Sequence, residues 1–218
     1  MLFTDDQLSN IPYVLSPPRF ATYLKHSQGN RAAALKLYQW NVQISSAFLI
    51  PLHFLEVSIR NAVVDRLDVV HTPNWPWNQG FIKSLPSTKG YSPQKNLEQV
   101  AYRQNTSGKV VADLKFVFWE KMFTARHDER LWINHIKHLF PNTGSGMTDS
   151  KIRESIYNDL FVIRQLRNRI AHHEPIFQRN IQEDYEKMFK LIYWRDATTA
   201  NWMNSMQYVT QLLSEEMN

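Results

Sequence analysis

Apolar residues recur at intervals of three and four along most of the chain, which is the spacing that lines one face of an α-helix. The clearest example is the segment 149–172, whose apolar positions are Ile152, Ile156, Leu160, Ile163 and Ile170. The alternation of apolar and polar residues that marks a β-strand does not persist anywhere, and glycine is scarce. We therefore predict an all-α protein.

Start and stop signals define the other helices. Serine followed by proline, at Ser16 and at Ser92, is typical of a helix N-terminus, and Pro51 should kink or break a long helical stretch. The predicted helices cover residues 16–28, 30–50, 52–67, 92–105, 109–123, 180–195 and 199–216.

Residues 72–91 contain several prolines and two glycines, so we expect a long irregular connection there. Trp75 and Trp77 within it could stack on nucleic-acid bases, but the prolines beside them favour hydrophobic anchors that pack the connection against the body. The segment Pro141–Thr148 is predicted to be a flexible loop. No stretch resembles a linker between independent domains, so a single domain over residues 1–218 is expected.

Composition narrows the class of protein. A net charge of +5 and a high isoelectric point are compatible with a polyanionic partner such as RNA. The absence of cysteine excludes disulfides, thiolate catalysis and cysteine-based zinc sites. The N-terminus is acidic where an export signal is basic, and the longest apolar run is about half the length of a membrane span. We therefore expect a soluble cytoplasmic protein with no membrane segment.

Candidate chemistry gathers in the stretch "RQLRNRIAHHEPIF" at the end of the 149–172 helix. Glu174 precedes Pro175, and a residue before proline avoids the helical region, so the helix should end at His172 or His173. The dipole at a helix C-terminus favours a positive charge, which makes a histidine there a plausible proton donor. Asn168 lies one turn before His172 and can orient its ring.

The arginines of this stretch suit a phosphate group. Arg167 would stabilise the charge that develops on a phosphodiester during cleavage, while Arg164 and Arg169 would bind neighbouring phosphates. His172 would transfer a proton as general acid or base, with His173 in a supporting role. The 2′-hydroxyl of RNA is itself a nucleophile, so no metal or other cofactor is expected. The alternative is that all these residues only cap the helix and form surface ion pairs.

A second stretch, "LHFLEVSIRN", places Glu56 and Arg60 one helical turn apart. They can form an ion pair within their own helix. Alternatively they can act with Asn61 as a supporting shell, in which Glu56 holds Arg60, Arg167 or a histidine in place. Both interpretations remain open at this stage.

His127, His135 and His138 are a weaker candidate for a metal site. Transition-metal sites usually need three or four convergent ligands with supporting partners, and the sequence around these histidines equally describes a solvated helix face. We therefore expect no metal there.

The stretch "RNRIAHHEPI", preceded by "YQWNVQISSAFLIPLHFLEVSIRN" about a hundred residues earlier, resembles the Abi-like abortive-infection family of bacterial phage-defence proteins, of the AbiD/AbiF type. That family belongs to the HEPN superfamily, named for higher eukaryotes and prokaryotes nucleotide-binding domains. The superfamily motif is an arginine, often followed directly by a polar residue, and then a histidine after four to six residues. Arg167, Asn168 and His172 match this pattern. The resemblance covers about residues 16–195.

This resemblance implies a HEPN-like helical bundle with its core at about 30–70 and 92–195, to which the helices 16–28 and 199–216 are additions. It also implies a homodimer whose interface includes the 149–172 helix and lies near the motif. The implied activity is that of a toxin-like, metal-independent endoribonuclease. RNA would be the substrate or a neutralising partner, and an antitoxin RNA or protein is expected. Some HEPN members only bind, so a non-catalytic RNA-binding or regulatory module is the alternative.

Overall fold

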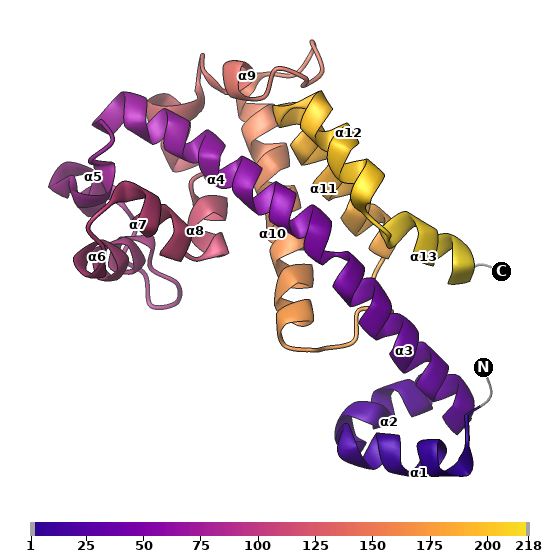
Figure 1. Ribbon diagram of the computed structural model, residues 1–218. Coiled ribbons are helices and arrows are strands. Elements are labelled where there is room, and N and C mark those ends of the chain that lie inside the picture. The colour runs from indigo at the N-terminus through magenta and orange to yellow at the C-terminus, as the bar shows by residue number, and fades with distance from the viewer. Residues whose placement is uncertain (1–2, 217–218) are drawn as a thin grey trace.

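The computed structural model describes residues 3–216 (Figure 1). Every regular element within these residues is helical, which confirms the all-α class. The α-helices are α1 (Asp5–Val14), α2 (Pro17–His26), α3 (Arg31–Ala47), α4 (Leu49–His71), α5 (Gln79–Ser84), α6 (Pro93–Arg103), α7 (Ser107–Asp113), α8 (Phe116–Lys121), α9 (Ile136–Leu139), α10 (Asp149–Ala171), α11 (Ile181–Arg195), α12 (Ala197–Met206) and α13 (Val209–Glu216). Three short turns of 3₁₀ or π geometry lie at Trp75–Trp77, Ala125–His127 and Asp128–Trp132.

Helices α3 and α4 form a long rod that crosses the molecule (Figure 1). The rod is interrupted at Phe48, which is the C-cap of α3 and the N-cap of α4. Pro51 therefore falls in the first turn of α4, where a missing N–H removes no intrahelical hydrogen bond. The break predicted for this proline lies before it rather than at it.

The main hydrophobic core is built around α4, α8, α10 and α11. Its fully buried side chains include Leu55 and Ile59 of α4, Ile156 and Leu160 of α10, and Met188 of α11. The apolar positions that predicted the long helix therefore mark its buried face. This core fixes the orientation of α10, and hence the position of its C-terminal end.

The proline-rich connection packs against the body as predicted. Trp75 is fully buried, and the Trp77 indole N–H donates to the backbone oxygen of Ala101 at 3.0 Å. Both tryptophans are thus anchors of the connection. The segment is more regular than expected, because it includes α5, whose first turn is capped by the Asn78 side chain.

A second, smaller hydrophobic cluster lies at the N-terminal end of the rod. Phe20, Tyr23, Ala34 and Leu35 are its buried members, contributed by α2 and α3, and α1 packs onto them. Figure 1 shows this group of helices set apart from the main body. The sequence pattern had not indicated α1.

Three details of the predicted helices are corrected. Ser16 is the N-cap residue of α2, but with φ of 83° its side chain makes no capping hydrogen bond, and the prolines provide the start signal. The predicted helix 109–123 is broken at Leu114, which has extended geometry. The predicted helix 199–216 is two helices, since Gln207 is extended and its side chain caps α13 through Thr210.

The rod Arg31–His71 contains an 18-residue window with a mean hydropathy of 1.5, long and apolar enough to cross a membrane. A core helix of a soluble protein meets the same criteria. We interpret α4 as a core helix, because Leu52, Leu55, Ile59, Val63 and Leu67 along it are buried.

Candidate active site

The candidate site lies at the C-terminal end of α10, which ends at Ala171 with His172 as its C-cap, as predicted. The His173 N–H donates to the Ile170 oxygen at 3.0 Å, and the Glu174 N–H donates to the Arg169 oxygen at 2.8 Å. This pair of bonds is a Schellman motif. It stops the helix and turns the chain sharply at the two histidines.

His173 occupies the position of this motif that requires left-handed backbone geometry, with φ of 56°. Glycine is the usual residue there, because a Cβ atom is strained in this conformation. A histidine at this place therefore costs stability relative to glycine, as does Gln28, which has φ of 52° at the equivalent position after α2.

Arg19 of α2 reaches the same helix end. Its Nη1 donates to the backbone oxygens of His172 at 3.5 Å and of His173 at 3.3 Å. A cation placed at the carbonyl end of a helix is favoured by the helix dipole. The contact brings a further arginine, from the N-terminal helices, next to both histidines.

The segment that follows α10 is held against α2 and α3. The backbone N–H of the buried Ile176 donates to the side-chain oxygen of Asn41 at 2.7 Å. The Phe177 ring packs on Tyr23, at 5.2 Å between centroids, and on His26, at 4.8 Å. These contacts fix the two histidines relative to α3.

Two cavities adjoin at this helix end and share the lining residues Tyr23, Tyr38, His173 and Glu174. The first, of about 430 Å³, is otherwise lined by Asn41, Val42, Ser45, Ser46, Leu49, Ile170 and Ala171. The second, of about 450 Å³, is otherwise lined by Pro18, Arg19, Thr22, His172 and Pro175. We call the two together the α10 cleft. One half of the cleft is mostly apolar and the other half carries the cations.

Tyr23 forms the wall between the two halves, and its ring lies 4.9 Å from that of Tyr38. Burial, with a smaller contribution from Tyr38, raises the pKa of Tyr23 to about 12, although Arg19 acts in the opposite direction. The phenol is therefore protonated at neutral pH.

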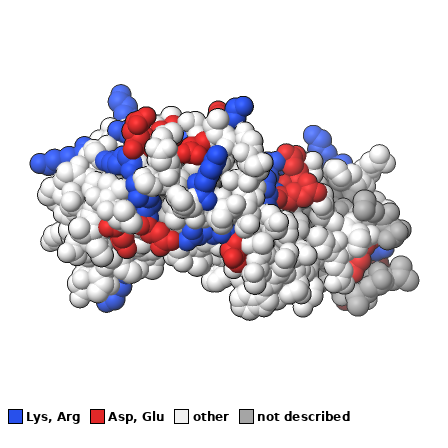
Figure 2. Space-filling view, turned by 90° about the horizontal axis from the view of Figure 1, so that it is seen from above, with Lys and Arg blue, Asp and Glu red and all other residues white. Residues whose placement is uncertain are grey.

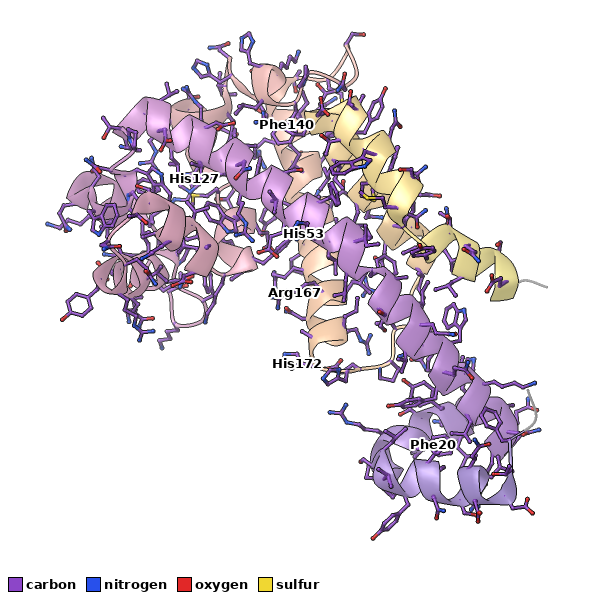
Figure 3. The ribbon with its side chains drawn as sticks, in the orientation of Figure 1. Phe20, His53, His127, Phe140, Arg167 and His172 are labelled. Carbon is purple, nitrogen blue, oxygen red and sulfur yellow. The ribbon has the colours of Figure 1, made fainter. Side chains whose placement is uncertain are left out.

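Arg167 and His172 both lie on the last turns of α10 (Figure 3) and are both exposed. Within residues 3–216, the Arg167 guanidinium takes part in no ion pair and no hydrogen bond links it to His172. The bond between His172 and Asn168 joins backbone atoms, at 2.9 Å. The structure thus leaves both motif side chains free at the surface, and of the two only His172 lines the cleft.

Arg164 is placed differently. Its guanidinium pairs with Glu120 of α8, which is fully buried and also has Lys121 Nζ at 3.1 Å. Any contact with phosphate would have to compete with this pair. Arg169 Nε lies 3.3 Å from a carboxylate oxygen of Glu174, as an ion pair without hydrogen-bond geometry.

Glu56 and Arg60 form an ion pair one turn apart on α4, and both side chains are partly exposed. Among the described residues, no ion pair or hydrogen bond joins this pair to Arg167 or to either motif histidine. Asn61 is exposed on the same helix. Of the two interpretations of this stretch, the structure shows the pair within one helix.

The histidines considered for a metal site do not converge. His127 is fully buried, its Nδ1 lies 3.0 Å from Arg130, and burial lowers its pKa to about 3. His135 and His138 are exposed. Over residues 3–216 the structure places no three His, Asp or Glu side chains where they could hold one metal ion.

The positive net charge is not gathered into one surface on the face drawn in Figure 2, where Lys and Arg are interspersed with Asp and Glu. This face therefore offers no continuous cationic surface for a polyanionic ligand.

Several residues of the cleft were missed by the sequence analysis. Arg19 and Tyr23 precede the motif by about 150 residues, and nothing local connects them to it. Asn41 and Tyr38 lie within a stretch already singled out, but their spacing gave no reason to select them. Glu120 carried a usable signal, because a lone carboxylate within "FVFWEKMF" must be paired if that aromatic run is buried.

The fold and the site together define an all-helical protein with a cationic cleft at the end of one long helix. No family model, no curated protein and no solved structure matches this chain.

Proposed function

We propose that this protein is a metal-independent endoribonuclease of a phage-defence system, related to the Abi-like proteins of the HEPN superfamily and active in the cytoplasm. The observation that carries the proposal is that Arg167 and His172 are both exposed and unpaired near the end of α10, where His172 lines the α10 cleft. The other arginines nearby have partners within the protein. Arg167 and His172 can meet a substrate without first breaking such a contact.

The proposed reaction is the transfer of a phosphodiester onto the neighbouring 2′-hydroxyl of RNA. The 2′-oxygen forms a bond to phosphorus and gives its proton to a water molecule of the solvent, while the bond from phosphorus to the 5′-oxygen breaks. His172 gives its proton to that departing oxygen, while Arg167 stabilises the negative charge on the non-bridging oxygens. The products are a 2′,3′-cyclic phosphate and a free 5′-hydroxyl.

The test is cleavage of single-stranded RNA by the purified protein, with and without a chelator. We expect His172→Ala to lower the cleavage rate by about a hundredfold or more, the usual scale for a general acid or base. Arg167→Ala should lower it comparably, because it removes charge stabilisation. His138→Ala is the matched control, since it changes an exposed histidine on α9 and should leave the rate unchanged.

Loss of cleavage in His173→Ala with full activity in His172→Ala would assign the proton transfer to the other histidine. Binding of RNA without cleavage by the unaltered protein would support the alternative, a non-catalytic RNA-binding or regulatory module.

A further inference from the structure

We propose that the α10 cleft is a nucleotide-binding site in which the apolar half holds one unpaired nucleobase of RNA and the cationic half holds the adjoining phosphate. This inference rests on the proposed function, because it takes RNA as the ligand. It adds which part of the RNA is recognised. The residues that build the cleft are largely those of α2 and α3, outside the motif.

The apolar half has the size and lining of a base pocket. Val42 and Leu49 leave 51% and 59% of their surface exposed, although they face a cavity of about 430 Å³. A flat aromatic ligand that covered them would remove apolar surface from water, and the partly exposed ring of Tyr38 is available for stacking. Such a mostly apolar pocket with a few polar groups, here Ser45 and Ser46, is typical of a small-ligand site.

The cationic half supplies groups for a phosphate. Arg19 uses only its Nη1 on the two backbone oxygens, at 3.3 and 3.5 Å, so other guanidinium N–H groups remain to fork onto an anion. His172 and His173 line the same half, and the Tyr23 phenol at the dividing wall keeps its proton. An apolar peptide side chain would fill the first half but would leave this second half unused.

The two halves adjoin, as the two parts of a nucleotide do. Because His172 lines the cationic half, a base seated in the apolar half would lie next to the phosphate where the proposed reaction occurs. The cleft would then select the nucleotide at the cleavage site. Glu174 is shared by both halves and is ion-paired with Arg169 through one carboxylate oxygen. Its other oxygen can accept from an exocyclic amino group, so uracil, which has none, should be the weakest base.

The probes are RNA-like 9-mers that are abasic at every position except the central one, which carries A, C, G or U, together with a fully abasic 9-mer. Their affinities for the full chain are measured by fluorescence anisotropy. We expect the best single base to strengthen binding about tenfold, within the usual range for one stacked base.

The decisive variant is Val42→Phe, which places a ring in the apolar half. We call the ratio of the affinity for the best single-base probe to that for the fully abasic probe the base advantage. Val42→Phe should reduce it to less than about twofold while leaving the affinity for the fully abasic probe unchanged. Val69→Phe is the matched control, because Val69 is 73% exposed on α4 and lines no part of the cleft. Arg19→Gln should weaken binding of all five probes alike, since it acts on the phosphate.

An equal advantage of the base in Val42→Phe and in Val69→Phe would overturn the proposal, as would the absence of any advantage in the unaltered protein. A Val42→Phe protein that changes its mass in light scattering and keeps the base advantage would show that the groove joins two copies of the chain.

The proposed function is tested separately: if RNA cleavage is insensitive to His172→Ala and Arg167→Ala but the base advantage behaves as expected, the pocket stands and the nuclease assignment fails. If cleavage depends on both residues but the base advantage does not depend on Val42, the nuclease assignment stands and the base pocket fails.

Discussion

At the scale of single residues, the two adjacent histidines are placed in different ways by the end of α10. His172 has ordinary backbone geometry, with φ of −94°, whereas His173 is left-handed and lines both halves of the cleft. The sequence analysis assigned proton transfer to His172 and a supporting role to His173. Arg19 of α2 donates to the backbone oxygens of both residues and both side chains are exposed, so the geometry allows that division without selecting it.

Replacing His173 by glycine separates the effect of its backbone strain on stability from the effect of its imidazole on RNA binding. The change should relieve about 1–2 kcal/mol of left-handed strain, less the roughly 0.5–1 kcal/mol that glycine loses in chain entropy. We therefore expect the free energy of unfolding to rise by between about 0 and 1.5 kcal/mol in urea denaturation, while RNA binding weakens because the imidazole leaves the cleft. His172→Gly is the control and should lower stability. A loss of stability in His173→Gly would show that its imidazole stabilises the fold more than its backbone strains it.

At the scale of helices, α10 is tied to its neighbours by charges as well as by its apolar face. The ion pair between Arg164 and Glu120 joins it to α8, and the carboxylate is fully buried. The same arginine was predicted from the sequence to bind phosphate. The two roles have different consequences for stability and for RNA binding, so one substitution distinguishes them.

We expect Arg164→Ala to lower the free energy of unfolding by an amount near the lower end of about 3–5 kcal/mol, because Glu120 would remain buried with only Lys121 nearby. Arg167→Ala, at an exposed and unpaired position, should change stability by no more than about 0.5 kcal/mol. Thermal and urea denaturation of both variants gives the comparison. If Arg164→Ala unfolds like the unaltered protein but binds RNA more weakly and with a smaller salt dependence, the arginine serves phosphate as the sequence analysis predicted.

At the scale of the whole molecule, the cleft lies where two hydrophobic clusters meet. The N-terminal cluster around Phe20 and the main core around α4 and α10 are connected by the rod and by the segment after His173. Phe177 belongs to the smaller cluster although it lies far from it in sequence. Access to the cleft therefore depends on how the N-terminal helices sit on the end of α10.

The resemblance to HEPN proteins also predicts a homodimer that includes α10. We expect light scattering at micromolar concentration to give twice the mass of the chain. Phe161 is 40% exposed on α10, so Phe161→Glu should shift the protein toward monomer by placing a charge in the interface. Tyr102→Glu, at a 93% exposed position on α6, is the control and should leave the mass unchanged. A monomeric unaltered protein, or a dimer indifferent to Phe161→Glu, would contradict the predicted interface.

The sequence by itself determined the helical class, the long helix and the place where that helix ends. These features depend on local physics: the spacing of Ile152, Ile156 and Ile163, and the restriction that Pro175 places on the residue before it. The tertiary structure decided what surrounds the motif. The approach of Arg19 to His172, the support of Ile176 by Asn41 and the pairing of Arg164 with Glu120 all join residues far apart in sequence, and such contacts leave no periodic signal along the chain. The left-handed backbone of His173 was also decided by the tertiary structure. Glycine is the residue that signals such a position in a sequence, and a histidine gives no such signal.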